Sequence, residues 1–149
     1  MKKETNRTLN ELIVKLFNNI MDIEEKAIIT GEFADITNND MHIMEAIGIE
    51  EPKKMSAIAK HLSVTVGTLT TNMNSLEDKG YIIRERSTTD KRVVLVSLTG
   101  KGKKAFYHHR DFHKKMIKSI VKDLNEEEMK VIFKCLLNLN DFLISEENK

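Results

Sequence analysis

The sequence predicts a mainly α-helical protein with one small β-hairpin, and three observations support this fold class. The 149 residues include one Pro and six Gly, so little of the chain is suited to turns. Apolar residues recur at spacings of three and four near both ends of the chain, as on one face of an α-helix. Two β-branched runs, at 80–86 and 93–98, indicate paired strands. We expect a single domain over 1–149.

The N-terminal third of the chain predicts two helices. One extends over about 9–30, where apolar side chains follow the helical period, and Gly31 ends it. Asn38 or Asn39 should then cap a second helix that continues to about Ile47. The buried face of this second helix is expected to comprise Met41, Ile43, Met44 and Ile47.

The C-terminal part predicts two further helices. The first, at 102–121, is basic, and the second opens at Asn125 with Glu128 at the third helical position. The broad apolar stripe of the last helix includes Cys135, which we expect to be an inert buried thiol. A buried core helix is one explanation of this stripe, but the chain offers few elements to cover it. We therefore expect 1–35 and 104–149 to form a dimer interface with a second copy.

The middle of the chain predicts a helix-turn-helix followed by the hairpin. Helices are expected at 55–62 and 66–79. Ala59, Ser63 and Leu69 have the spacing at which a small residue permits close helix crossing, a second fits the turn and an aliphatic fills the gap. Any helical hairpin can imitate this pattern, but a two-stranded wing following it is typical of a DNA-binding unit. The 87–92 loop contains no Gly, so a long projecting loop is expected.

The second of these helices has one face without charged residues. Its buried side is expected to carry Val66, Leu69, Met73 and Leu76. The opposite side and its flank carry small or hydrogen-bonding residues, namely Gly67, Thr68, Thr71, Asn72, Asn74 and Ser75. Thr and Asn can reach phosphates and base edges in a DNA groove, whereas a merely solvated face more often carries Lys and Glu. Thr65 should cap this helix, where free N–H groups suit a phosphate.

Charge is distributed unevenly along the chain. The whole sequence has a formal net charge of +1, from 24 Lys and Arg against 23 Asp and Glu. Residues 51–104 contain eleven Lys or Arg and five Asp or Glu, a net +6, which leaves −5 for the remainder. A basic central region attached to acidic ends is what salt-sensitive phosphate binding requires.

Together these features resemble the MarR family of dimeric winged-helix transcription regulators. The resemblance covers nearly the whole chain, including the run 76–82, and is most specific at 90–92 and 98–102. It implies that Arg92 reaches DNA, typically in the minor groove, and that Asp90 helps to fix the wing. A surface ion pair that stabilises a turn is the other interpretation of these two residues.

The resemblance implies a repressor that binds a pseudopalindromic operator as a homodimer, through a winged helix-turn-helix region at 36–103. We expect the following residues to contact DNA: Thr65, Gly67, Thr68, Thr71, Asn72, Ser75, Arg84, Arg86, Asp90, Lys91 and Arg92.

Within the family, several segments resemble repressors of fatty-acid synthesis genes, above all residues 67–71. This resemblance implies that a long acyl chain, carried by acyl carrier protein, occupies a pocket near the dimer interface and acts as corepressor. Its expected lining is Ile20, Ile23, Phe33, Met41, His42, Met44, Phe106, Phe112 and His113. Ordinary core packing also accounts for each Met and Phe of this set. The acidic carrier would dock on the basic residues Lys103, Lys104, Arg110, Lys114, Lys115 and Lys118.

A metal-responsive or small-ligand-responsive repressor is the alternative function. His108 or His109 lies one helical turn from His113, and His42 is expected nearby, so these imidazoles could chelate zinc. Lysines flank His113 and no thiolate accompanies the group, which disfavours a divalent ion. We predict no metal and no cofactor.

Other classes of protein find little support in the sequence. It carries no phosphate-binding glycine loop, nucleophile elbow or motif-placed carboxylate pair, so we do not expect an enzyme. A winged helix used for protein contacts alone would be expected to have a charged second helix and a wing without Arg. One Cys, no apolar run long enough to span a membrane and no signal peptide lead us to expect a cytoplasmic, untruncated chain.

Overall fold

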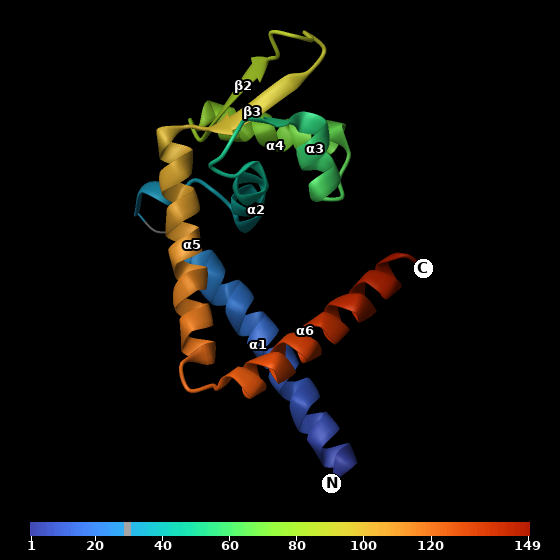
Figure 1. The fold of residues 1–149 in the computed structure, drawn as a ribbon. Coiled ribbons are helices and arrows are strands. Elements are labelled where there is room, and N and C mark those ends of the chain that lie inside the picture. Colours follow the sequence, from blue (N-terminus) through green and yellow to red (C-terminus); the bar gives the residue numbers. More distant parts are fainter. Residues whose placement is uncertain (29–30) are drawn as a thin grey trace. The chain divides into compact units, whose positions relative to one another are not determined.

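The computed structural model describes residues 1–28 and 31–149, which form helices and a small antiparallel sheet (Figure 1). In chain order the elements are α1 (Lys2–Ile28), the 3-10 helix η1 (Gly31–Phe33), α2 (Asn38–Ile47), β1 (Lys53–Lys54), α3 (Met55–His61), α4 (Val66–Asp78), β2 (Ile82–Arg86), β3 (Val94–Leu98), α5 (Gly100–Val121) and α6 (Glu126–Glu147). The fold class is therefore the predicted one. The described residues divide into two compact units, Met1–Phe112 and His113–Lys149, whose boundary lies within α5.

The core of the first unit lies among α2, α3, α4 and the sheet. Leu69, Met73 and Leu76 have no exposed surface, so the predicted buried side of α4 is largely confirmed. The predicted buried face of α2 is also confirmed, because all four of its apolar residues are at most 2% exposed. Val66, however, is 47% exposed. It is the first residue of α4, where the chain enters from the surface turn, so the core does not reach it.

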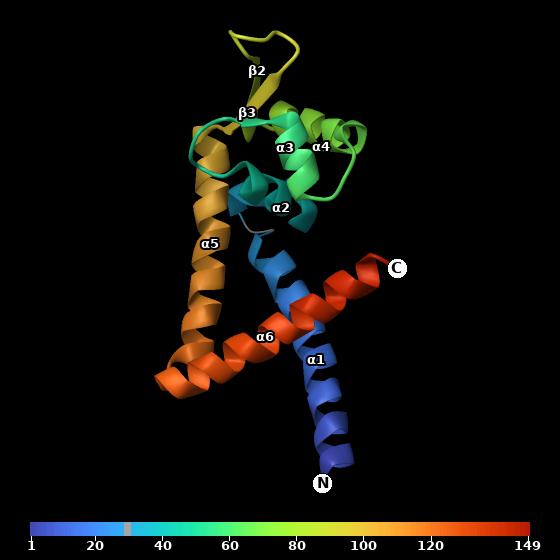
Figure 2. The same ribbon diagram turned by 45° about the vertical axis from the view of Figure 1, so that its right-hand side comes forward.

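The sheet contains one strand more than the sequence predicted. β2 and β3 form the expected antiparallel hairpin, with Ile82 opposite Leu98. The two-residue strand β1 pairs with the other edge of β3, where Lys53 lies opposite Val96. The loop between β2 and β3 projects beyond the helices of this unit, as expected from its lack of glycine (Figure 2).

The helix ends follow local hydrogen bonding. Thr37, and not Asn38 or Asn39, caps α2: its Oγ1 accepts from the backbone N–H of Asp40 at 3.1 Å, and Asp40 Oδ2 accepts from that of Thr37 at 3.0 Å. Asp40 completes a capping box for Thr37 only, which explains the preference. The capping box at the start of α6 is confirmed. α1 begins at Lys2, earlier than predicted, and its expected end at Thr30 lies outside the described residues.

A close contact joins α5 to the turn that precedes β2. Tyr81 is fully buried, and its hydroxyl donates a hydrogen bond to Asp35 Oδ1 at 2.5 Å. Burial and this hydrogen bond raise the pKa of Tyr81 above its ordinary value, so the phenol stays protonated. A Cβ on Gly102 would lie 2.1 Å from the backbone oxygen of Tyr81. Only glycine therefore permits this approach, which holds the hairpin against the start of α5.

The terminal helices expose apolar side chains. In α1 these are Leu9, Leu12, Ile13, Val14, Leu16, Phe17, Ile20, Met21 and Ile23. In α6 they are Val131, Phe133, Leu136, Leu137, Leu139, Phe142, Leu143 and Ile144. Cys135 is also exposed, contrary to the expected buried thiol, because no described residue of α6 is buried within the single chain. None of the described helices is long and apolar enough to span a membrane.

A buried histidine connects three helices of the first unit. The ring of His109 on α5 is 1% exposed, and it lies 2.5 Å from Glu24 Oε1 on α1 and 2.6 Å from Glu45 Oε1 on α2. Burial by itself lowers the pKa of His109, but the hydrogen bonds and negative charges of Glu45 and Glu24 outweigh it and raise the pKa above its ordinary value. His42 faces the same ring, with the two centroids 6.5 Å apart.

This cluster predicts a stability that depends on pH. Because the pKa of His109 is raised by folding, its contribution is fully present below about pH 6.5 and is lost as the pH rises through the raised pKa. His109→Gln should lower the free energy of unfolding by about 3 kcal/mol at pH 6, because the buried Glu24 carboxylate loses this hydrogen-bonded cation. It should also flatten the pH dependence of this free energy as the pH rises from about 6.5 through the raised pKa of His109.

The measurement is chemical denaturation over that pH range, with His61→Gln as the control. His61 is an exposed histidine on α3, so its replacement removes one histidine without taking a partner from a buried carboxylate. A His109→Gln profile as steep as that of the parent would contradict this account of the cluster.

Candidate nucleic-acid interface

The tight turn between α3 and α4 has the predicted helix-turn-helix arrangement. Ala59 is 3% exposed, and its backbone oxygen accepts a hydrogen bond from Val64 N at 3.0 Å. Ser63 adopts a φ of 54°, in the left-handed region where a small polar residue is tolerated better than a bulky one. Leu69 is fully buried between the helices and the sheet. The three residues that predicted the motif therefore occupy the expected places.

The face of α4 away from the core carries short polar side chains. Gly67, Thr68 and Thr71 are exposed, while Asn72 and Ser75 are half-buried. Thr65 caps the helix: its Oγ1 accepts from the backbone N–H of Thr68 at 3.1 Å and donates to Thr68 Oγ1 at 2.9 Å. This surface offers hydrogen-bonding groups without a fixed charge, so it can follow base edges and phosphates closely.

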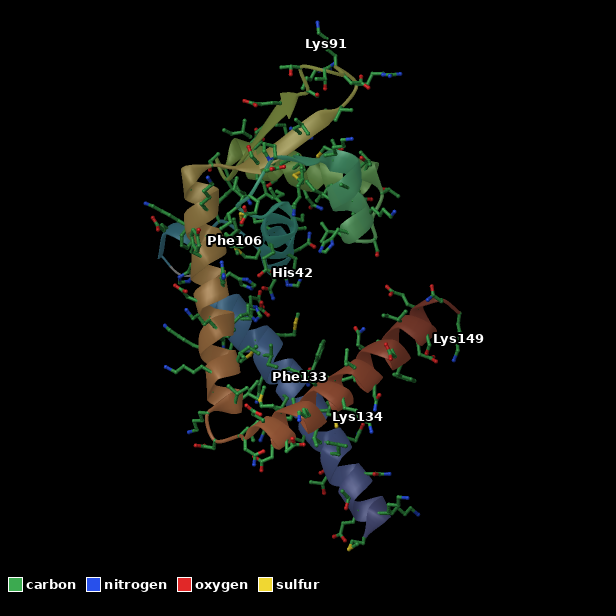
Figure 3. All side chains as sticks on the ribbon, viewed as in Figure 1. His42, Lys91, Phe106, Phe133, Lys134 and Lys149 are labelled. Carbon is green, nitrogen blue, oxygen red and sulfur yellow. The ribbon has the colours of Figure 1, made fainter. Side chains whose placement is uncertain are left out.

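The tip of the hairpin presents a pre-oriented arginine. Arg92 has a side chain that is 91% exposed, and its Nε and Nη2 donate to Asp90 Oδ1 at 3.2 Å and Oδ2 at 3.3 Å. Asp90 Oδ1 also accepts from Arg92 N, and these hydrogen bonds lower the pKa of the Asp90 carboxyl. Figure 3 shows Lys91 extending from the same tip. The aspartate thus limits the motion of the loop while the guanidinium stays accessible.

The arginines of β2 differ in their environments. Arg86 is exposed, and its Nη1 donates to the backbone oxygen of Lys91 at 3.4 Å, so it lies along the hairpin loop. Arg84 is only 21% exposed and turns toward α4, where Glu77 receives it. Sequence reasoning placed both arginines at the interface and did not identify Glu77. The acidic Glu77 before the α4–β2 turn and the basic Arg84 after it were the sequence signal that could have predicted this ion pair.

The predicted effector residues of the first unit are buried, half-buried or exposed. Phe33, Met41 and Met44 are buried in the core, whereas Ile20 and Ile23 are exposed on α1. His42 is exposed, and Phe106 and Phe112 are half-buried. The single chain therefore brings only part of this set together. His113 belongs to the second unit.

The histidines and basic residues of α5 have different environments. His108 Nε2 lies 2.8 Å from the backbone oxygen of Ala27, and its ring centroid is 5.4 Å from that of Phe33. His108 and His109 are thus both engaged with α1. Among the candidate docking residues, those of the first unit, Lys103, Lys104 and Arg110, are exposed. Lys114, Lys115 and Lys118 in the second unit are exposed as well.

Comparison with known proteins agrees with this geometry. The profile described as "MarR family" matches residues 36–94, which include α2, the helix-turn-helix and the start of β3. Among solved structures, FabT of Streptococcus pneumoniae in complex with DNA is 42% identical with a TM-score of 0.85, over 97% of this chain and 99% of that one. MepR of S. aureus, also solved with DNA, is 24% identical with a TM-score of 0.69, over 89% and 96%, and supports the fold alone.

Two curated relatives are named as HTH-type transcriptional regulators. SarZ of Staphylococcus saprophyticus is 36% identical over 69 residues, which span 46% of this chain and 47% of that protein. PchR of Bacillus subtilis is 27% identical over 121 residues, which span 78% of this chain and 72% of that protein. These relatives are regulators, in agreement with the expectation that the chain is not an enzyme.

Proposed function

Since this chain belongs to the MarR family of winged helix-turn-helix transcription regulators, we propose that it is a homodimeric repressor that binds a pseudopalindromic operator. The observation that carries the proposal is the uncharged, hydrogen-bonding face of α4 beside a hairpin whose tip exposes Arg92. In this arrangement α4 enters the major groove, and the hairpin reaches the flanking minor groove. The similar FabT was solved in complex with DNA, which supports DNA binding by this chain.

The proposed homodimer follows from the exposed apolar residues of α1 and α6. Eight large hydrophobic residues of α6 are between 41% and 61% exposed, although soluble monomers rarely leave so many large apolar side chains on one helix in water. A second copy of the chain would bury them and present two α4 helices about one turn of DNA apart. The proposed cytoplasmic location fits a regulator of this class.

We assign the regulated genes to fatty-acid synthesis, with acylated acyl carrier protein as corepressor. The likeness to FabT over nearly both whole chains supports this assignment, together with the residue run 67–71. An acyl chain would enter among the apolar residues of α1, α2 and α5, and the exposed lysines of α5 would attract the acidic carrier. A zinc-responsive repressor remains the second candidate because His42 and His109 lie near each other.

The DNA-binding assignment predicts different effects for Arg92 and Thr71. Arg92→Ala should weaken binding to the operator and to unrelated duplexes alike, and should reduce the salt slope by about one, because the contact is electrostatic. Thr71→Val should instead reduce the preference for operator by about 1–3 kcal/mol, because it removes a hydrogen-bonding group from the groove-facing side. Fluorescence anisotropy over a range of salt concentrations measures both.

Lys3→Ala provides a matched loss of one positive charge on α1, away from the residues proposed to contact DNA. It should leave both affinities nearly unchanged. An Arg92→Ala variant that binds operator as tightly as the parent at about 0.15 M salt would refute the role given to the wing.

The dimer assignment predicts a dependence on the apolar side of α6. Sedimentation at micromolar concentration should find a dimer, and Leu137→Glu should dissociate it by placing a charge in the buried interface. Leu137 is 61% exposed in the single chain, so the substitution costs little packing within the protomer. Lys134→Gln on the same helix should leave the dimer intact. A stable folded monomer of the parent would exclude the proposed assembly.

The effector assignment predicts that acylated carrier protein tightens operator binding, while the carrier without its acyl chain does much less. Only the loaded carrier can fill an apolar site and favour one arrangement of the dimer. The same titration is repeated with zinc and with a chelator. Release by the chelator, abolished by His42→Gln or His109→Gln, would support the zinc alternative, and indifference to the acylated carrier would exclude the preferred corepressor.

A further inference from the structure

Arg84 is held by three hydrogen bonds from its side chain to α4. Its Nη2 donates to Asn74 Oδ1 at 2.7 Å and to Glu77 Oε1 at 3.0 Å, and its Nε donates to Glu77 Oε2 at 3.2 Å. The contact with Glu77 is therefore bidentate, an arrangement that fixes the orientation of both groups. Arg84 lies on β2 and its partners lie on the last two turns of α4, so the cluster connects the hairpin with the helix.

The backbone of β2 takes part in the same cluster. Arg84 N donates to Glu77 Oε2 at 3.1 Å. β2 is an edge strand of the sheet, and Arg84 lies opposite Val96 on its single neighbour β3. An outward N–H of an edge strand would otherwise face water, so Glu77 supplies a partner for it. The Glu77 carboxylate thus accepts hydrogen bonds from both the main chain and the side chain of Arg84, the middle residue of β2.

The three arginines of the hairpin therefore have separate environments. The Arg84 side chain is 21% exposed, that of Arg92 is 91% exposed, and Arg86 is exposed along the loop. A residue that contacts phosphates needs its guanidinium at the surface. Arg84 instead has its donors directed at α4, and the hydrogen bond from Arg84 keeps the pKa of Glu77 below its ordinary value, so the pair is ionised near neutral pH.

We propose that Arg84 is a positioning residue for operator recognition: through Glu77 and Asn74 it fixes the hairpin against α4 and so sets the spacing between the groove-facing Thr71 and the wing tip. The inference rests on the proposed DNA-binding function. It gives Arg84 a different role from the direct DNA contact expected from the sequence. The spacing matters because α4 and the wing must enter neighbouring grooves at the same time.

The pair also affects the electrostatics of the interface. Glu77 is the first acidic residue of α4, and an unpaired carboxylate there would repel a nearby DNA backbone. Pairing with Arg84 neutralises it. Replacing either Arg84 or Glu77 therefore removes the fixed spacing between α4 and the wing tip. Replacing Arg84 by a neutral residue makes the net charge more negative, whereas replacing Glu77 by one makes it more positive. This difference in sign makes the proposal testable.

The test compares Arg84→Gln, Glu77→Gln and the double variant with the parent, using a duplex that the parent selects from a random pool and one unrelated duplex. Each single variant should bind the selected duplex about tenfold less tightly or worse, and the double variant should lose no more than either single variant, because one interaction is broken in all three. Affinity for the unrelated duplex and its salt slope should not fall for Glu77→Gln, which removes a negative charge. Thermal unfolding of each variant is measured in parallel.

Arg86→Gln is the matched control, since it removes an exposed arginine from the same strand. It should lower the salt slope of binding to both duplexes. It should not weaken binding to the selected duplex more than binding to the unrelated one. Arg84→Lys keeps the charge but lacks the planar guanidinium that binds Glu77 and Asn74 at the same time. Its affinity for the selected duplex should therefore fall as that of Arg84→Gln does. This second variant also decides the matter if Arg84→Gln does not fold.

Three outcomes would overturn the inference. Arg84→Lys or Glu77→Gln binding the selected duplex as tightly as the parent would indicate that Arg84 contacts phosphate directly. A loss of binding to both duplexes in proportion to the fraction unfolded would indicate a purely structural role. A parent that shows no salt-dependent DNA binding would overturn the proposed function and this inference together, whereas the first two outcomes leave the proposed function intact.

Discussion

The burial of one side of α4 is the constraint on which the rest of the structure depends. Leu69, Met73 and Leu76 have no exposed surface, and each fully buried aliphatic side chain contributes about 1.5–3 kcal/mol from removal of apolar area from water. This packing fixes the rotation of α4 about its axis. The rotation in turn decides that Thr68 and Thr71 face outward. The proposed DNA-reading surface can be uncharged because its orientation comes from the core and not from its own contacts.

Features set by period and by local hydrogen bonds could be predicted from the sequence. The helical spacing of small and apolar residues identified both helices of the helix-turn-helix. The Asn125 cap of α6 was recognisable from the glutamate three residues later. The same rule, applied to Thr37 and Asp40, would have given the correct cap for α2, but the higher intrinsic preference of asparagine favoured its neighbours. β1 could not be predicted, because two exposed lysines show no period and pair only where β3 offers an edge.

Side-chain partners across elements were beyond prediction for a different reason. Arg84 and Glu77 meet because the turn at Gly80, with a φ of 82°, and the buried Tyr81 bring β2 back along α4. Composition predicted a basic hairpin at the DNA interface, but it could not distinguish an arginine whose side chain faces solvent from one that faces a carboxylate seven residues earlier. Likewise, the buried position of Cys135 was inferred from its apolar neighbours, although no residue of α6 is buried among the residues that the structure describes.

The polar contacts of the first unit suggest how a signal at the terminal helices can reach the DNA-reading surface. His109 binds Glu24 of α1 and Glu45 of α2, so a displacement of α1 acts directly on α2. α2 packs on α3 and on β3 through the shared core, and Arg84 holds β2 to α4. Closely packed interiors transmit such shifts because they deform little. An effector that moves α1 therefore needs no contact with α4 to alter the placement of the helix and the wing, provided that it binds the two arrangements with different affinity.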